Sequence, residues 1–291
     1  MTDTAAEFSP YRRLTSGERQ LAEHPLLEGI TALQRLLPLS EARFERKLGR
    51  AMAVATRRGT GFYLAGFASR RALGRELWID IDPAVLERRL EHRFRQDGRV
   101  HVIRDRCLGA GDWSPLIRRL GRSTTHREVA EVVEAGFLYR ETPSYAKALD
   151  RARGPKPMRR NFVRLSSPDK VEAYFRQTAD MCRSIAELGL MRRSDYGRRL
   201  SSFARPSVRL PWVEFGELDI GVAIGAGGEL YRFASGKHRT AAAQALKLTS
   251  IPVEIRLVHA EWLARHMGTG LTPLAALRKG IEALAKAKPG R

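Results

Sequence analysis

Apolar and polar residues alternate along Leu230–Ala234, which is the pattern of a half-buried strand. Gly236 permits a sharp turn after this strand, and Lys237–Leu248 then shows the Ala- and Leu-rich pattern of a helix. A second strand is predicted over Ile251–Val258, after a short break. This part of the chain is therefore predicted to run strand, tight turn, helix, turn and strand.

The rest of the chain mixes helical and strand patterns, which predicts an α/β (α+β) protein. A basic amphipathic helical pattern runs from Pro25 to about Arg58. Asp82-Pro83 is typical of a helix start, so we expect a helix from Ala84 to Phe94. Further helices are expected at Thr125–Gly136, Pro168–Gly189 and Leu274–Lys286, and further strands at Glu76–Asp82, Arg99–Arg104 and Ile220–Ile224.

The segment Arg153–Arg160 concentrates Gly, Pro and positive charge, which is typical of a linker. We therefore expect a mainly helical N-terminal region with short strands over residues 1–155, in which residues 1–25 form a poorly ordered arm. A second domain is expected over residues 160–262. Residues 263–291 are expected to form a basic C-terminal helix.

The formal charge is +20, from 52 Lys and Arg against 32 Asp and Glu. Such an excess favours anionic partners, with nucleic acid or an anionic membrane surface as the candidates, although an Arg-rich proteome would also explain it. Because no signal peptide or membrane-spanning run is found, we expect a cytoplasmic protein, with peripheral contact at the inner membrane surface left open. Cys107 and Cys182 are expected to be small buried apolar residues.

The predicted turn before the helix at Lys237 concentrates hydrogen-bond donors. The backbone N–H groups of a first helical turn have no partner within the helix, and the helix dipole places positive charge there. Phosphate is the anion we expect at such a place. The predicted phosphate-binding residues are Ser235, Gly236, Lys237, His238, Arg239 and Thr240.

Phosphoryl transfer also needs a group that orients or deprotonates the acceptor hydroxyl, and usually carboxylates that hold Mg²⁺. Asp219 and Glu217 precede a predicted strand and are the acids we expect to act with His238 as a proton carrier. Glu214, Glu187 and Glu254 are the other candidate acids. The metal ligands are left unassigned.

Three segments carry a family resemblance. Ser235-Gly-Lys-His-Arg239 with its Ala-rich helix and Ile251-Pro-Val253, together with Ser184–Leu190 and Asp219–Ile224, resembles the ParB/sulfiredoxin-like fold over about residues 160–262. The resemblance implies a mixed-sheet nucleotide-binding domain. In addition, Gly111-Asp-Trp113 is similar to a segment of uncharacterised prokaryotic ParB-like proteins with the same C-terminal turn, and Asp112 and Trp113 either contact a substrate or form a tight turn.

Three departures limit what the resemblance implies. Lys237 stands where sulfiredoxins have their catalytic Cys, so sulfinate reductase activity is not implied. Ser235 stands where the kinases of the fold typically have an acid. Only about 30 residues follow Trp262, whereas ParB proteins continue into helix-turn-helix segments.

Together these observations predict an ATP- or CTP-dependent, kinase-like phosphotransferase that acts on a hydroxylated small molecule or saccharide. The alternative is a non-enzymatic ParB-like module that binds nucleic acid and is switched by nucleotide. Its nucleic-acid contacts would come from the Arg-rich loop over residues 191–211. A membrane-associated partner of an envelope-polymer enzyme is a third interpretation.

Overall fold

The structure is a computed structural model that describes residues 12–13, 40–96, 99–160, 163–192, 219–268 and 270–287. These residues form an α/β protein with eight helices and an eight-stranded mixed sheet, which confirms the predicted fold class. The helices are α3 (Glu41–Arg58), α4 (Gly66–Leu73), α5 (Thr124–Glu134), α6 (Pro143–Arg153), α7 (Pro168–Leu188), α9 (Lys237–Ala245), α10 (Ala260–Met267) and α11 (Pro273–Lys286).

The main sheet has the strand order β2-β7-β13-β11-β12-β4-β8, and β3 also pairs with β13. Its strands are β2 (Gly61–Ala65), β3 (Trp78–Ile81), β4 (Arg88–Leu90), β7 (Arg106–Ala110), β8 (Ile117–Arg119), β11 (Gly221–Ile224), β12 (Leu230–Phe233) and β13 (Ile251–His259). The remaining strands are β1 (Arg12–Arg13), β5 (Arg93–Gln96) and β6 (Arg99–Val102) in one small sheet, and β9 (Met158–Arg160) with β10 (Val163–Leu165) in another.

The long strand β13 lies at the centre of the main sheet. It is parallel to β11 and β7 and antiparallel to β3. Beyond β11, β12 is antiparallel to β11 and parallel to β4. The sheet therefore joins strands from both sides of the linker predicted at residues 153–160, because β2, β3, β4, β7 and β8 precede it and β11, β12 and β13 follow it.

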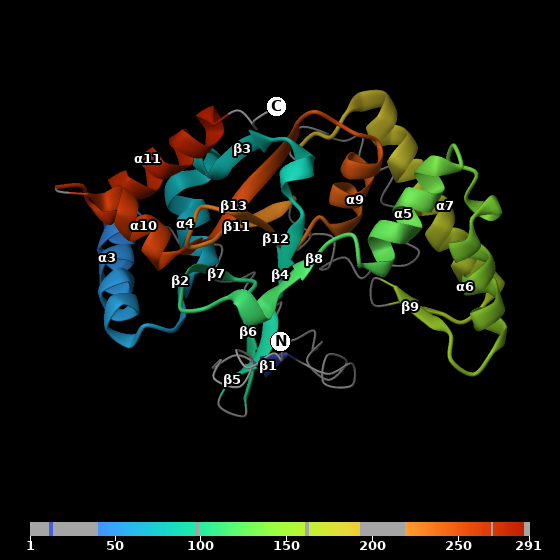
Figure 1. Ribbon diagram of the computed structural model, residues 1–291, viewed down its shortest axis with the longest axis horizontal. Helices are drawn as coiled ribbons and strands as arrows, with labels where there is room; N and C mark the ends of the chain where they lie inside the picture. The colour runs from blue at the N-terminus through green and yellow to red at the C-terminus, as the bar shows by residue number, and fades with distance from the viewer. Residues whose placement is uncertain are drawn as a thin grey trace, which may run out of the picture.

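Two groups of helices lie at opposite ends of this sheet. Figure 1 shows α3, α4, α10 and α11 at one end and α5, α6, α7 and α9 at the other. All eight of these helices contribute buried residues to one large apolar core, among them Phe44 of α3 and Phe175 of α7. A smaller core of aromatic and aliphatic residues around Phe94 and Phe233 packs separately. Within the described residues, no helix has the length and apolar character needed to cross a membrane.

The turn between β12 and α9 has the conformation that the sequence predicts. Ala234 and Gly236 both have positive φ, of 67° and 77°. A Cβ atom at Gly236 would lie 2.6 Å from Cγ1 of Ile220, so both the backbone conformation and the close approach require glycine. Because β12 is fixed in the sheet, this turn aims the N-terminus of α9 at a defined place beside β11 and β12.

The prediction of a helix from Ala84 to Phe94 is wrong. Asp82 caps only a single 3-10 turn, Pro83–Val85, and the chain then forms β4 and β5. Leu86, Leu90 and Phe94 are all buried, and their spacing of four residues imitates a helical stripe. Pairing of β4 with β12 and β8 outweighs that local pattern, and it brings Arg89 beside β12.

Candidate anion-binding site

The predicted turn residues divide into two that bond the turn itself and three that are partly exposed. The Thr240 side chain is fully buried and donates to the Gly236 carbonyl at 2.9 Å, so it closes the first turn of α9. The Ser235 hydroxyl donates to the main-chain carbonyl of Asp219. Lys237, His238 and Arg239 are only partly buried. The turn therefore uses its two hydroxyls for its own structure and presents its cationic and imidazole side chains.

Asp219 lies directly at this turn, as predicted. Its Oδ1 accepts a hydrogen bond from Arg239 Nη1 at 2.9 Å, and both side chains are largely buried. Arg239 is thus held by a carboxylate. The second predicted acid, Glu217, lies outside the described residues, as do Glu214 and nearly all of the Arg-rich loop.

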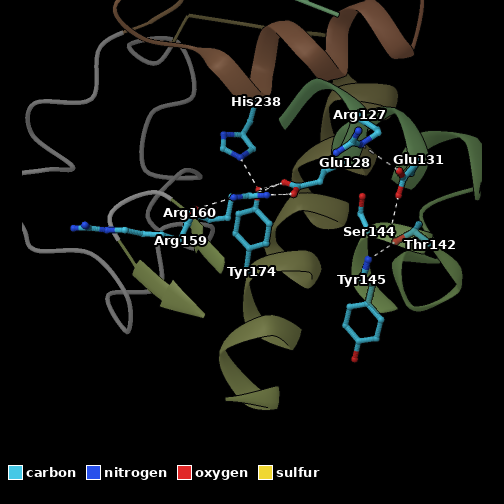
Figure 2. Close-up of polar contacts among 10 residues, drawn as sticks. All are labelled: Arg127, Glu128, Glu131, Thr142, Ser144, Tyr145, Arg159, Arg160, Tyr174 and His238. Carbon is cyan, nitrogen blue, oxygen red and sulfur yellow. Dashed lines mark hydrogen bonds and ion pairs between the residues drawn. The ribbon is translucent and has the colours of Figure 1, made fainter. Parts of the chain in front are cut away.

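His238 is held from the opposite side by Tyr174 of α7. The Tyr174 hydroxyl lies 3.1 Å from His238 Nε2 and donates to Glu128 Oε2 at 3.0 Å. Since the hydroxyl has one proton and donates it to Glu128, His238 Nε2 is the donor to Tyr174. Arg160 Nε lies 3.0 Å from both oxygens of Glu128, and Figure 2 shows these four side chains converging while Arg159 points away.

Burial and the charge of Glu128 raise the pKa of Tyr174. The phenol therefore stays neutral and keeps the proton that it donates. Glu128 comes from α5, Tyr174 from α7 and His238 from α9, and all three helices pack together. The chain Glu128–Tyr174–His238 fixes the orientation and the tautomer of the imidazole.

The members of a group of basic side chains act on one another beside the Glu128–Tyr174–His238 hydrogen bonds. We call Arg89, His126, Arg232 and Lys237 the basic cluster. Arg232 of β12 is directly opposite Arg89 of β4 in the strand register. Arg232 is 5% exposed, and its Nη1 donates to the Ser235 carbonyl at 3.1 Å. Its Nε is buried and has no hydrogen-bond partner among the described residues.

The members of the basic cluster perturb one another. Burial and then the charges of Arg89, Arg232 and Arg160 lower the pKa of Lys237 to about 8, against the opposing effect of Glu128. Burial, followed by Arg89, lowers the pKa of Arg232 to about 10. Burial, followed by Arg232, Lys237 and Arg89, lowers the pKa of His126 to about 4. All three shifts favour loss of positive charge, with burial as the first cause and the neighbouring cations as the second.

The ion pairs around the basic cluster show which of its positive charges have a carboxylate partner. Arg89 Nη2 is 2.7 Å from Glu91, and Arg160 is paired with Glu128. Arg232 and Lys237 form no ion pair within the described residues, although Glu91 opposes the charge of Arg232 and Glu128 that of Lys237 without direct contact. Burying a charge without a partner is costly, and an anion bound here would offset that cost.

Other candidate residues are not brought to this place. Glu254 is bonded by Arg256 and Arg70 at 2.8 and 2.9 Å. Glu187 is exposed near the end of α7. Asp112 accepts hydrogen bonds from the main chain and hydroxyl of Ser114, which is tight-turn chemistry, and Trp113 is buried in the smaller core.

Five side chains of this site were not predicted from the sequence, namely His126, Glu128, Tyr174, Arg89 and Arg160. Arg232 offered a signal, because a charged residue between Tyr231 and Phe233 interrupts a strand that is otherwise buried. Arg160 was assigned to a linker. It lies instead in the hairpin of β9 and β10, at 17% side-chain exposure, and reaches Glu128.

Comparison of the chain with family models, curated proteins and solved structures found no match in any of the three. The resemblance over residues 160–262 therefore remains a prediction from the sequence. What the site does is inferred from its geometry and charge.

Proposed function

We propose that the chain is a nucleotide-dependent phosphotransferase with a ParB/sulfiredoxin-like phosphate-binding turn. It would use ATP or CTP and a hydroxylated small molecule or saccharide as acceptor. The observation that carries the proposal is the pair of cations Arg232 and Lys237 at the N-terminus of α9, which form no ion pair within the described residues. A polyphosphate supplies several negative charges to such a place, and the helix end adds its N–H groups and dipole.

The residues around the turn have separate roles in this proposal. Lys237 and Arg232 hold the phosphates by charge-assisted hydrogen bonds. His238 carries a proton to or from the acceptor hydroxyl, with its Nε2 fixed on Tyr174. Asp219 accepts a hydrogen bond from Arg239 at the same turn. It is the predicted catalytic acid that the structure places there. Tyr174 and Glu128 are positioning residues because they act through His238.

Mg²⁺ often accompanies nucleotides, and it would neutralise charge on the transferred phosphoryl group. Within the described part of the chain, no three His, Cys, Asp or Glu side chains are placed to hold a metal ion. Asp219, the acid at the turn, is already bonded by Arg239. These residues do not form a protein-held metal site, so no step of the proposal passes through one.

Titration calorimetry with ATP, CTP and GTP, each with and without Mg²⁺, tests the proposal. Lys237→Met should weaken binding of the preferred nucleotide roughly tenfold or more, because a charge-assisted contact is lost. Lys279→Met, on the exposed face of α11, is the matched control and should leave affinity unchanged. Absence of nucleotide binding, or equal effects of the two substitutions, would overturn the proposal.

The non-enzymatic alternative keeps the nucleotide site and lacks turnover. The net charge of +20 favours it. The two are separated by incubating the nucleotide-bound protein with candidate hydroxylated acceptors and measuring nucleoside diphosphate. Nucleotide binding without any diphosphate, together with salt-sensitive retention on DNA, would favour the alternative.

A further inference from the structure

His126 is a buried imidazole with no described partner. It lies in the first turn of α5 and is 8% exposed. Both ring nitrogens are buried, and neither makes a hydrogen bond within the described residues. A buried polar atom left without a hydrogen-bond partner destabilises the folded protein. Two such atoms on one side chain point to a group that occupies this place in the working protein.

The charged groups that act on His126 offer one kind of partner only. Arg232, Lys237 and Arg89 are the charges that act on its ring, and all of them are hydrogen-bond donors. Glu128, two residues along α5, is occupied by Arg160 and Tyr174. The basic cluster therefore provides an abundance of donors for an oxyanion and, through neutral His126, a single acceptor nitrogen.

A neutral imidazole has one N–H donor and one acceptor nitrogen. His126 stays neutral at pH 7 because burial and the three nearby cations lower its pKa to about 4. Protonating a group of that pKa at pH 7 costs a factor of roughly a thousand in affinity. A ligand that brings its own O–H proton to the acceptor nitrogen avoids this cost.

We propose that His126 contacts the bound phosphoryl group and shares one proton with it, so that the site selects oxyanions that carry an O–H group. This inference rests on the proposed function, because Arg232 and Lys237 serve both. The ligand class is a phosphate monoester or terminal phosphoryl group in its monoprotonated form. Sulfate and phosphate diesters have similar oxygens but carry no O–H at pH 7, and the site discriminates against them.

The test uses the full chain and titration calorimetry at pH 7 with inorganic phosphate, sulfate, methyl phosphate and dimethyl phosphate. Phosphate and methyl phosphate should bind at least about tenfold more tightly than sulfate and dimethyl phosphate, because only the first two satisfy the acceptor nitrogen. In His126→Leu the preference for phosphate over sulfate should fall to near unity. His101→Leu, in the small sheet of β5 and β6, is the matched control and should keep the preference.

The outcome in the unmodified protein needs no variant, so the test does not depend on how His126→Leu folds. Equal affinity for phosphate and sulfate would overturn the inference, and so would a preference that persists in folded His126→Leu. If nucleotides bind while phosphate and sulfate compete equally, the inference fails and the nucleotide site stands. If phosphate is preferred but no nucleotide binds, the nucleotide proposal fails and His126 keeps its role.

Discussion

Two arginines in the main sheet have nearly the same burial and very different surroundings. Arg256 of β13 is 3% exposed and Arg232 of β12 is 5% exposed. Burial is the first cause that lowers the pKa of each to about 10. Arg256 donates to Glu254 at 2.8 Å and to the main-chain carbonyl of Asp219 at 2.9 Å. Within the described part of the chain, Arg232 donates only to the Ser235 carbonyl and forms no ion pair with a carboxylate.

Burial alone therefore does not distinguish an arginine whose hydrogen bonds are satisfied within the fold from one that lacks a partner. Arg256 has the partners that a charge buried for stability requires. Arg232 leaves its buried Nε without a partner among the described residues, and under the proposed function an anionic ligand supplies that partner. Asp219 links Arg256 to the turn before α9, because its main-chain carbonyl accepts a hydrogen bond from Arg256 and its carboxylate accepts one from Arg239.

The largest effect is expected from substituting the two arginines by methionine. Arg256→Met should lower the free energy of unfolding by about 3 kcal/mol, because Glu254 loses a buried partner and keeps only Arg70. Arg232→Met should change it by less than about 1 kcal/mol or increase it, because an unpaired charge is removed. Denaturant unfolding checks both values. Equal destabilisation by the two substitutions would end the distinction between them.

Asp219, which contacts both Arg256 and Arg239, should affect turnover. Asp219→Asn should lower turnover by at least about a hundredfold, with nucleotide affinity nearly unchanged, because the acid beside the turn loses its charge. Asp180→Asn, on the exposed surface of α7, is the matched control. Steady-state kinetics with direct nucleotide titration separates the two effects. Unchanged turnover would remove Asp219 from catalysis.

Two tyrosine–glutamate pairs allow a test of the positioning chain. Tyr174 donates to Glu128 and contacts His238, whereas Tyr145 donates to Glu172 at 2.7 Å, away from the turn. Tyr174→Phe should lower turnover roughly tenfold to a hundredfold and shift the pH profile of kcat, because His238 loses its fixed orientation. Tyr145→Phe should leave the profile in place. A profile that neither substitution moves would show that Tyr174 has no part in proton transfer.

The smallest effect concerns the pH dependence of anion binding. The pKa of Lys237 is lowered to about 8, so the free protein loses this charge above that value. Affinity for sulfate, which does not itself titrate in this range, should therefore be constant below pH 7 and fall about tenfold between pH 7 and 9. Lys237→Arg should flatten the decline, since Arg keeps its proton. A decline that persists in Lys237→Arg would assign it to another group.

The sequence predicted best where structure is local. The strand, turn and helix around Gly236 formed as expected. Two clear periodic patterns define the strand and the helix, and the turn between them has a position that only glycine can occupy. Asp219 was placed correctly, because the strand that follows it pairs with β12. The long helix α7 was likewise predicted, at Pro168–Gly189.

The missing part of the site depends on tertiary packing. Arg89 was hidden because Leu86, Leu90 and Phe94 repeat at a helical spacing although the chain forms strands there. The helix that carries His126 and Glu128 was predicted, but its periodicity does not show that α5 packs on α9. Arg160 lay in a segment whose Gly and Pro content is typical of a linker.

Thermal unfolding with and without nucleotide tests the central claim most directly, that Arg232 is buried to hold an anion. The unmodified protein should melt several degrees higher with saturating ATP or CTP, because a ligand that binds only the folded state stabilises it. Arg232→Met should melt at the same or a higher temperature than the unmodified protein without nucleotide, and should gain little from it. A loss of stability without ligand, combined with a full nucleotide-induced shift in Arg232→Met, would contradict the account.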